Sequence, residues 1–271
     1  MRGEHSLVPE YAKAVREAGF DFTDSELTSL ANVQVSVRYL VALRDAGLTD
    51  LRADEVSQLA VHEVDPDYIL GLRKLGFEDI SISQLVQLAI HDVSLETIQE
   101  AFDAGFEDLK IPQLVELTIH GISPNYIREA RELGLEELTF RELIQFGIHG
   151  VHLDWVREIQ KLELPDLTPR QIINMAIHGV TPDSVRAMME LGLPDLTVKE
   201  LTNMHIHGVT SRFAEAMADL SLPDLTARTL TEMAIHGVDV EMAEKARKQY
   251  GDDLTARKLI EIAIHGYDEG C

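Results

Sequence analysis

The chain has 271 residues, of which 45% are hydrophobic and 6% aromatic, and its 47 acidic and 24 basic residues give a net charge of −23. The hydrophobic content is enough to bury a core, which excludes a disordered chain on composition. The negative charge repels phosphate backbones, and no basic stripe is evident in the sequence, so we expect no nucleic-acid partner. Such a charge is typical of a soluble, elongated protein, or of one with a basic protein partner.

Neither a membrane span nor a leader is expected from this sequence. No stretch approaches the roughly 18 apolar residues that cross a bilayer. The N-terminal residues also lack a charged segment followed by an apolar run. The only cysteine, Cys271, is the last residue, so no intramolecular disulfide can form. We therefore expect a chain that is soluble as given and has no membrane contact of its own.

Histidine recurs at a spacing of 29 residues, and the residues around it recur with it. The series is His62, His91, His120, His149, His178, His207, His236 and His265. Self-similarity at a fixed period is the signature of repeat architectures, in which short units bury their apolar faces against one another. We expect an all-α fold, namely a superhelical α-solenoid of nine tandem 29-residue two-helix repeats.

The repeat boundaries follow from the histidine positions. We expect one tandem-repeat domain over residues 1–271, with a short C-terminal tail at 266–271. The nine repeats are 5–33, 34–62, 63–91, 92–120, 121–149, 150–178, 179–207, 208–236 and 237–265.

The first repeat differs from the others. Its Val8-Pro9 pair is displaced by one residue, the register recovers before Thr23, and Asn32-Val33 replaces the Ile-His pair. These departures predict a degenerate N-terminal cap.

A middle repeat, 179–207, shows the expected pair of helices. Thr181, followed by proline, is typical of a helix start. Gly192 suits the end of this helix, and Thr197 begins the next one with a capping-box sequence. We expect the second helix to end at His207 and to bury three apolar residues, Leu201, Met204 and Ile206.

The last repeat has a polar first helix and an apolar second helix. The first helix carries Lys245, Arg247, Lys248 and Gln249. A terminal repeat without a polar outer face is incompletely capped. The last helix could therefore self-associate end to end with another copy, or the natural protein could continue beyond residue 271.

The repeat resembles a known type of short bacterial helical repeat. The clearest matches are Gly121-Ile122-Ser123-Pro124-Asn125-Tyr126-Ile127-Arg128 and Val64-Asp65-Pro66-Asp67-Tyr68-Ile69. Similar repeats form the extracytoplasmic tails of membrane peptidases of the antibiotic-sensing antirepressor type, and the resemblance covers residues 7–267. It implies an extracytoplasmic setting and no activity, since the zincin motif H-E-x-x-H is not completed after His62-Glu63. The uniform period is also typical of an idealised or designed array.

The repeated histidines are expected in the last turn of each second helix. There an imidazole N–H can bond the free carbonyls of the helix end, which favours a structural role. A pH-sensitive seam and a metal site are the alternatives. Equivalent residues in adjacent repeats should lie roughly 8–10 Å apart in a row, whereas zinc needs several ligands within about 2.1 Å of one ion. We therefore expect no metal and no cofactor.

Two further positions recur. One, in the second helix, is polar and expected to face solvent, and it is the candidate interaction row: Gln58, Gln87, Glu116, Gln145, Asn174, Asn203, Glu232 and Glu261. Solenoids use such rows as binding surfaces, although any solvated helix face is also polar. The other, in the first helix, is aromatic, with packing between repeats as its favoured role and an exposed binding stripe as the alternative: Tyr39, Tyr68, Tyr126, Trp155 and Phe213.

Three functional hypotheses follow. No nucleophile elbow, phosphate loop or convergent acid–base pair is evident, so we expect no enzyme and no catalytic residues. The leading hypothesis is a protein–protein interaction scaffold with an acidic helical surface that binds an unidentified protein or peptide. A structural spacer or designed repeat without a ligand is the second hypothesis, and a metal- or pH-responsive protein acting through the histidines is the third.

Overall fold

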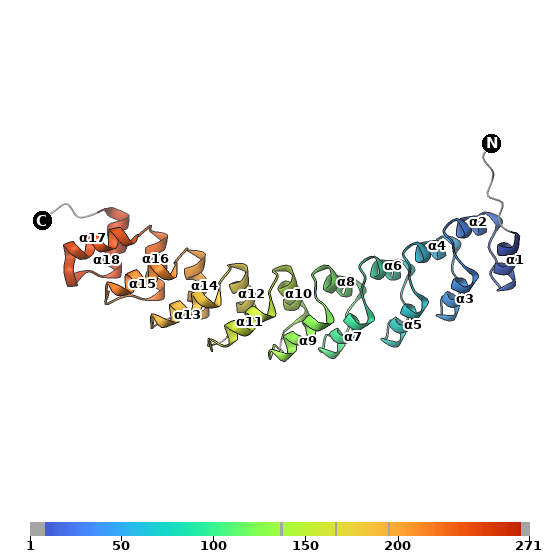
Figure 1. Ribbon diagram of the computed structural model, residues 1–271, viewed down its shortest axis with the longest axis horizontal. Coiled ribbons are helices and arrows are strands. Elements are labelled where there is room, and N and C mark those ends of the chain that lie inside the picture. The colour runs from blue at the N-terminus through green and yellow to red at the C-terminus, as the bar shows by residue number, and fades with distance from the viewer. Residues whose placement is uncertain (1–8, 136–137, 166, 195, 267–271) are drawn as a thin grey trace, which may run out of the picture. The chain divides into compact units, whose positions relative to one another are not determined.

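The computed structural model describes residues 9–135, 138–165, 167–194 and 196–266 (Figure 1). These residues form eighteen α-helices and one short 3-10 helix, and they contain no strand, which confirms the all-α prediction. The chain divides into two compact units, Met1–Arg128 and Glu129–Cys271, called below the N-terminal and C-terminal units. Cys271 and most of the expected tail lie outside the described residues.

Odd-numbered and even-numbered helices alternate as the first and second helix of each repeat. The first helices are α1 (Pro9–Glu17), α3 (Val37–Asp45), α5 (Pro66–Lys74), α7 (Leu95–Asp103), α9 (Pro124–Glu132), α11 (Leu153–Gln160), α13 (Pro182–Glu190), α15 (Ser211–Asp219) and α17 (Val240–Tyr250). The second helices are α2 (Asp24–Asn32), α4 (Ala53–Val61), α6 (Ile82–Ile90), α8 (Ile111–Ile119), α10 (Phe140–Ile148), α12 (Pro169–Ile177), α14 (Val198–Ile206), α16 (Ala227–Ile235) and α18 (Ala256–His265). The 3-10 helix η1 (Gly251–Asp253) follows α17.

Side-chain caps set the starts of the second helices. The Thr23 hydroxyl accepts from the Glu26 backbone N–H, and the Glu26 carboxylate accepts from the Thr23 N–H, which completes a capping box. At the start of α4 the cap position holds Arg52, whose side chain accepts no hydrogen bond from the helix. The other bond of the capping box remains, because the Arg52 backbone N–H donates to the Glu55 carboxylate at 2.9 Å. The last helix is also capped from the preceding repeat, since Asp224 accepts from the backbone N–H of Ala256 at 2.6 Å.

A left-handed residue ends the helices of the repeat. Gly121 and Gly150 follow second helices with φ of 71° and 60°. The same slot holds Gln34, Glu63 and Asp92 after the second helices α2, α4 and α6, with φ between 52° and 60°. The slot after the first helix behaves alike, since Glu163 and Ser221 replace its usual glycine at φ of 50° and 49°. The chain therefore accepts backbone strain where glycine is missing.

Each unit is built by packing equivalent helices of neighbouring repeats on one another. In the N-terminal unit α2 contacts α4, α4 contacts α6 and α6 contacts α8, and α1, α3, α5 and α7 form a parallel series. In the C-terminal unit the even-numbered helices from α10 to α18 and the odd-numbered helices from α11 to α17 do the same. One second-helix position supplies a buried residue to each step: Leu30, Leu59, Leu88, Leu117, Phe146, Met175, Met204, Met233 and Ile262.

Hydrogen bonds between repeats accompany this packing. The Tyr39 hydroxyl donates to the Val64 carbonyl oxygen at 2.8 Å, and the Tyr68 hydroxyl donates to the Val93 carbonyl oxygen at 2.6 Å. In the C-terminal unit the indole N–H of Trp155 donates to the carbonyl oxygen of Val180 at 3.0 Å. Packing between repeats is thus confirmed as the role of Tyr39, Tyr68 and Trp155.

A second set of hydrogen bonds runs from a side chain back to a carbonyl of the preceding repeat. These bonds were not predicted. The Arg44 guanidinium donates to the Ala18 carbonyl oxygen at 2.7 Å, and Arg73 donates to that of Gly47 at 3.3 Å. At the equivalent position in the C-terminal unit the Gln160 amide donates to the carbonyl oxygen of Leu133 at 2.9 Å. These bonds satisfy carbonyls at the ends of first helices, where the helix itself supplies no donor.

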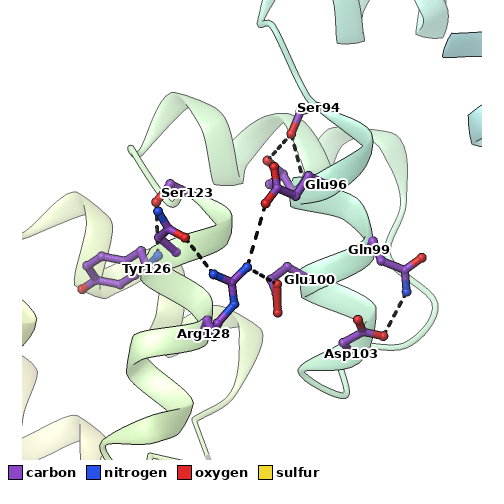
Figure 2. Close-up of polar contacts among 10 residues, drawn as sticks. Ser94, Glu96, Gln99, Glu100, Asp103, Ser123, Tyr126 and Arg128 are labelled. Atoms are coloured by element: carbon purple, nitrogen blue, oxygen red, sulfur yellow. Dashed lines mark hydrogen bonds and ion pairs between the residues drawn. The ribbon is translucent and has the colours of Figure 1, made fainter.

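An ion pair adds to these links near the end of the N-terminal unit (Figure 2). Arg128 lies 2.8 Å from the Glu100 carboxylate of α7 and 3.9 Å from that of Glu96. Its other terminal nitrogen donates to the Asn125 side-chain oxygen at 2.8 Å, so the guanidinium is held on its own helix while it reaches the preceding repeat. Partly exposed pairs of this kind contribute little stability, and their main effect is to fix orientation.

The left-handed slots predict which substitutions stabilise the chain. Glu63→Gly should raise the free energy of unfolding by about 0.5–1 kcal/mol, because glycine adopts positive φ without strain. Gly121→Ala is the matched control at the same slot and should lower it by about 1 kcal/mol, because a Cβ there meets no atom within 4 Å and only backbone strain remains. Urea unfolding followed by circular dichroism measures both. A loss of stability in Glu63→Gly would contradict the assignment of a strained left-handed conformation to Glu63.

The tyrosine links predict a dependence of stability on alkaline pH. Burial raises the pKa of Tyr39 and of Tyr68 to about 12, whereas an unfolded tyrosine ionises near pH 10. The stability they contribute is therefore full below about pH 10 and is lost as the pH rises through about 12. The double variant Tyr39→Phe, Tyr68→Phe should be less stable by about 1 kcal/mol per lost hydrogen bond at pH 8.

The difference between this variant and the parent should shrink as the pH rises from about 10 toward 12. Thermal melts of both proteins at a series of pH values measure it. A difference that stays constant over this range would argue against the two hydrogen bonds.

Candidate interaction surface

The predicted polar row lies at the surface of the second helices. Gln58, Gln87, Glu116, Asn174 and Glu261 are exposed, and the other three members, Gln145, Asn203 and Glu232, are half-buried. Some members have polar neighbours on their own helix. The Glu232 carboxylate lies 3.0 Å from Arg228, and the Gln145 side-chain oxygen lies 3.2 Å from His149 Nε2. The row is accessible, and its role in binding stays a prediction.

The repeated histidines sit at the ends of the second helices. From His62 to His236 each one is the C-cap residue, with φ between −96° and −90°, and its backbone N–H donates to the carbonyl four residues earlier. His265 is the last residue of α18. All eight imidazoles are exposed or half-buried. Within the described residues no group of three His, Cys, Asp or Glu side chains is placed to hold a metal ion.

One prediction about the second helices is wrong, because Ile206 is exposed. It follows the buried Met204 by two residues, which turns its side chain about 200° around the helix axis and away from the core. Its equivalents behave alike, and all are between 45% and 60% exposed: Val61, Ile90, Ile119, Ile148, Ile177, Ile206, Ile235 and Ile264. We call these residues the aliphatic row.

The expectation that no basic stripe exists is also wrong for the C-terminal unit. One exposed cation lies in the first turn of each second helix there: Arg141, Arg170, Lys199, Arg228 and Arg257. We call these residues the basic row. They recur at the same 29-residue spacing as the histidines, so the period of the sequence itself identifies them. The overall acidity of the chain concealed them, because net charge carries no information about local pattern.

In the C-terminal unit the basic row and the aliphatic row lie on one face of each second helix. Lys199, Asn203 and Ile206 stand at positions i, i+4 and i+7 of α14, which lie within about 60° of one another around the helix. The polar row thus runs between the basic row and the aliphatic row. In the N-terminal unit the aliphatic row is present, but the slot of the cation holds Asp54, Ser83 and Pro112.

An open hollow in the N-terminal unit matches no predicted site. It is lined mainly by the residues after α5 and α7, and the ring of Phe77 stacks there on that of Phe102 from the last turn of α7, with the centroids 6.1 Å apart. The carboxylates around these rings are Glu78, Asp79, Glu107 and Asp108.

Comparison with known proteins leaves the relationship of the chain open. The sequence matches no protein-family model, and no curated protein matches it significantly. The resemblance to extracytoplasmic bacterial repeats therefore stays a prediction. None of the described helices combines the length and the hydropathy that a membrane crossing requires.

The exposed position of the aliphatic row predicts a contrast within α12. Ile177 is 47% exposed and Ile172 is fully buried, so the two residues provide a matched pair of substitutions. Ile177→Ala should lower the free energy of unfolding by less than about 1 kcal/mol, whereas Ile172→Ala should lower it by about 2–5 kcal/mol. The shift in urea midpoint measures both. Equal losses would mean that Ile177 belongs to the core.

Proposed function

We propose that the chain is a non-enzymatic scaffold, a solenoid of nine tandem two-helix repeats that binds a protein or peptide on the exposed face of its second helices. The observation that carries the proposal is the aliphatic row. A single exposed isoleucine needs no explanation. The same exposed slot holds valine or isoleucine in three second helices of the N-terminal unit and in five of the C-terminal unit, which gives each unit a regular apolar row, and such surfaces are typical of interaction sites.

The energetics also favour binding. Each of these side chains keeps roughly half of its area in water, so covering it yields about 1 kcal/mol at 25 cal/mol per Å². Several such contacts in a row would sum to a useful affinity even after the cost of association. The polar row beside them supplies hydrogen-bonding groups that can fix the register of a partner.

Two alternatives make different use of the same features. A spacer or designed array would carry the aliphatic row only as part of a repeated sequence, and no partner would cover it. A pH-responsive protein would depend on the histidines, whose backbone groups cap the second helices. The exposed apolar slot favours the scaffold, because neither alternative requires aliphatic side chains in water.

The proposal is tested by selection from a random peptide display library on the immobilised full chain. The parent should enrich a family of related peptides. The variant Ile90→Ser, Ile119→Ser, Ile177→Ser, Ile235→Ser should bind them at least ~10-fold more weakly, since four half-buried contacts are lost. The control variant Leu70→Ser, Met189→Ser changes exposed apolar residues of first helices and should bind as the parent does.

Two results would count against the scaffold. No enrichment above the blank support would favour the spacer. Equal losses in the test and control variants would show that binding is non-specific adhesion to exposed apolar groups.

A further inference from the structure

The C-terminal unit carries a face that the proposed scaffold role does not by itself require. Along α10, α12, α14, α16 and α18 the basic row and the aliphatic row flank the polar row, one member of each per helix. Successive helices of this series are in contact, and Figure 1 shows α10, α12, α14 and α16 on one side of the unit with α11, α13 and α15 on the other. We call this surface the basic–aliphatic face.

The cations of this face are unexpected on two grounds. Lys and Arg make up 24 of 271 residues, so five at one repeat position in five consecutive repeats do not follow from composition. They also stand in the first turn of their helices, where the helix dipole disfavours positive charge. In α16 the cation pairs with Glu232 on its own helix, and in α12 Arg170 lies 3.7 Å from Glu142 of the preceding repeat.

We propose that the basic–aliphatic face binds an extended acidic peptide that carries one carboxylate and one aliphatic side chain for every helix it crosses. The proposal rests on the scaffold function and names its partner class. The carboxylates lie against the basic row, and the aliphatic side chains cover the aliphatic row. The whole chain has a net charge of −23, so the surface away from the basic row repels the same peptide, which confines it to this face.

The spacing of the rows fits such a peptide. A cation and an aliphatic residue seven positions apart on one helix are separated by about 10 Å along its axis. Neighbouring second helices should lie about 8–10 Å apart. Three residues of extended chain in the polyproline II conformation span about 9 Å, so one triplet crosses one helix. Five helices therefore accommodate about 15 residues.

The chemistry of the face favours a peptide over a nucleic acid. Single-stranded nucleic acids bind where aromatic side chains stack on bases, and the exposed residues beside the cations are isoleucines. Glu232 and Glu261 lie between the two rows and would repel a continuous phosphate backbone, whereas a peptide can present a neutral residue to them. The N-terminal unit lacks the cations, so the site is confined to the C-terminal unit.

The test uses the full chain and a fluorescein-labelled peptide of five Glu-Leu-Ser triplets, with binding followed by fluorescence anisotropy. The parent should bind this peptide and bind a Lys-Leu-Ser counterpart at least ~10-fold more weakly. The variant Arg141→Gln, Lys199→Gln, Arg257→Gln should weaken binding of the acidic peptide by ~10-fold or more. The control variant Arg212→Gln, Lys245→Gln, Lys248→Gln removes the same charge from the first helices α15 and α17 and should change binding less than ~2-fold.

Several outcomes overturn the proposal. No binding of the acidic peptide does so, as do equal losses in both variants. Competition by single-stranded RNA at equal strength would show a general polyanion site, and dimerisation that the test variant abolishes would show that a second copy covers the face. If the display library instead enriches neutral or basic peptides, the scaffold function stands and the acidic partner is wrong. If it enriches nothing, the scaffold function itself fails.

Discussion

The packing of equivalent helices from one repeat to the next is the constraint on which the structure depends. Most helices here have nine residues, and isolated helices of that length are marginal in water because nucleation is costly. Each second helix is stable because it buries residues such as Leu59 or Met204 between neighbours. Hydrogen bonds such as that from the Tyr39 hydroxyl to the Val64 carbonyl add specific polar contacts between neighbouring repeats. The core therefore depends on contacts between neighbouring repeats.

The same constraint organises the surface. Because helices of neighbouring repeats pack through equivalent positions, any exposed position also recurs at a regular interval within each unit. A residue type repeated at such a position becomes a row, as the aliphatic row and the basic row illustrate. Both units carry the aliphatic row, whereas only the C-terminal unit carries the basic row. The same helical framework therefore presents a chemically different face in each unit. Variation at a single position is therefore enough to change the chemistry of the surface in one part of the chain.

Much of the fold could be predicted because its local signals are strong. The cap at Thr197, the aromatic packing of Tyr39 and the left-handed Gly192 all follow from residue type and spacing. The candidate surface was harder to predict. Ile206 was expected in the core because aliphatic residues are usually buried, yet its angle around the helix points it to solvent.

The cations were missed for a different reason. A protein with 47 acidic residues suggests a uniformly acidic surface, whereas Arg141 and its equivalents occupy one exposed position in five repeats. Links such as Arg44 to Ala18 could not be predicted either, because they depend on how far apart two helices lie.

The central claim is that the second helices of the C-terminal unit form a binding face, and hydrogen–deuterium exchange tests it most directly. Exchange would be measured on the full chain with and without the most strongly enriched display peptide. We predict slower exchange of the first-turn amides of α10, α12, α14, α16 and α18, with no change in α11, α13 and α15. Protection confined to the first helices would contradict the account.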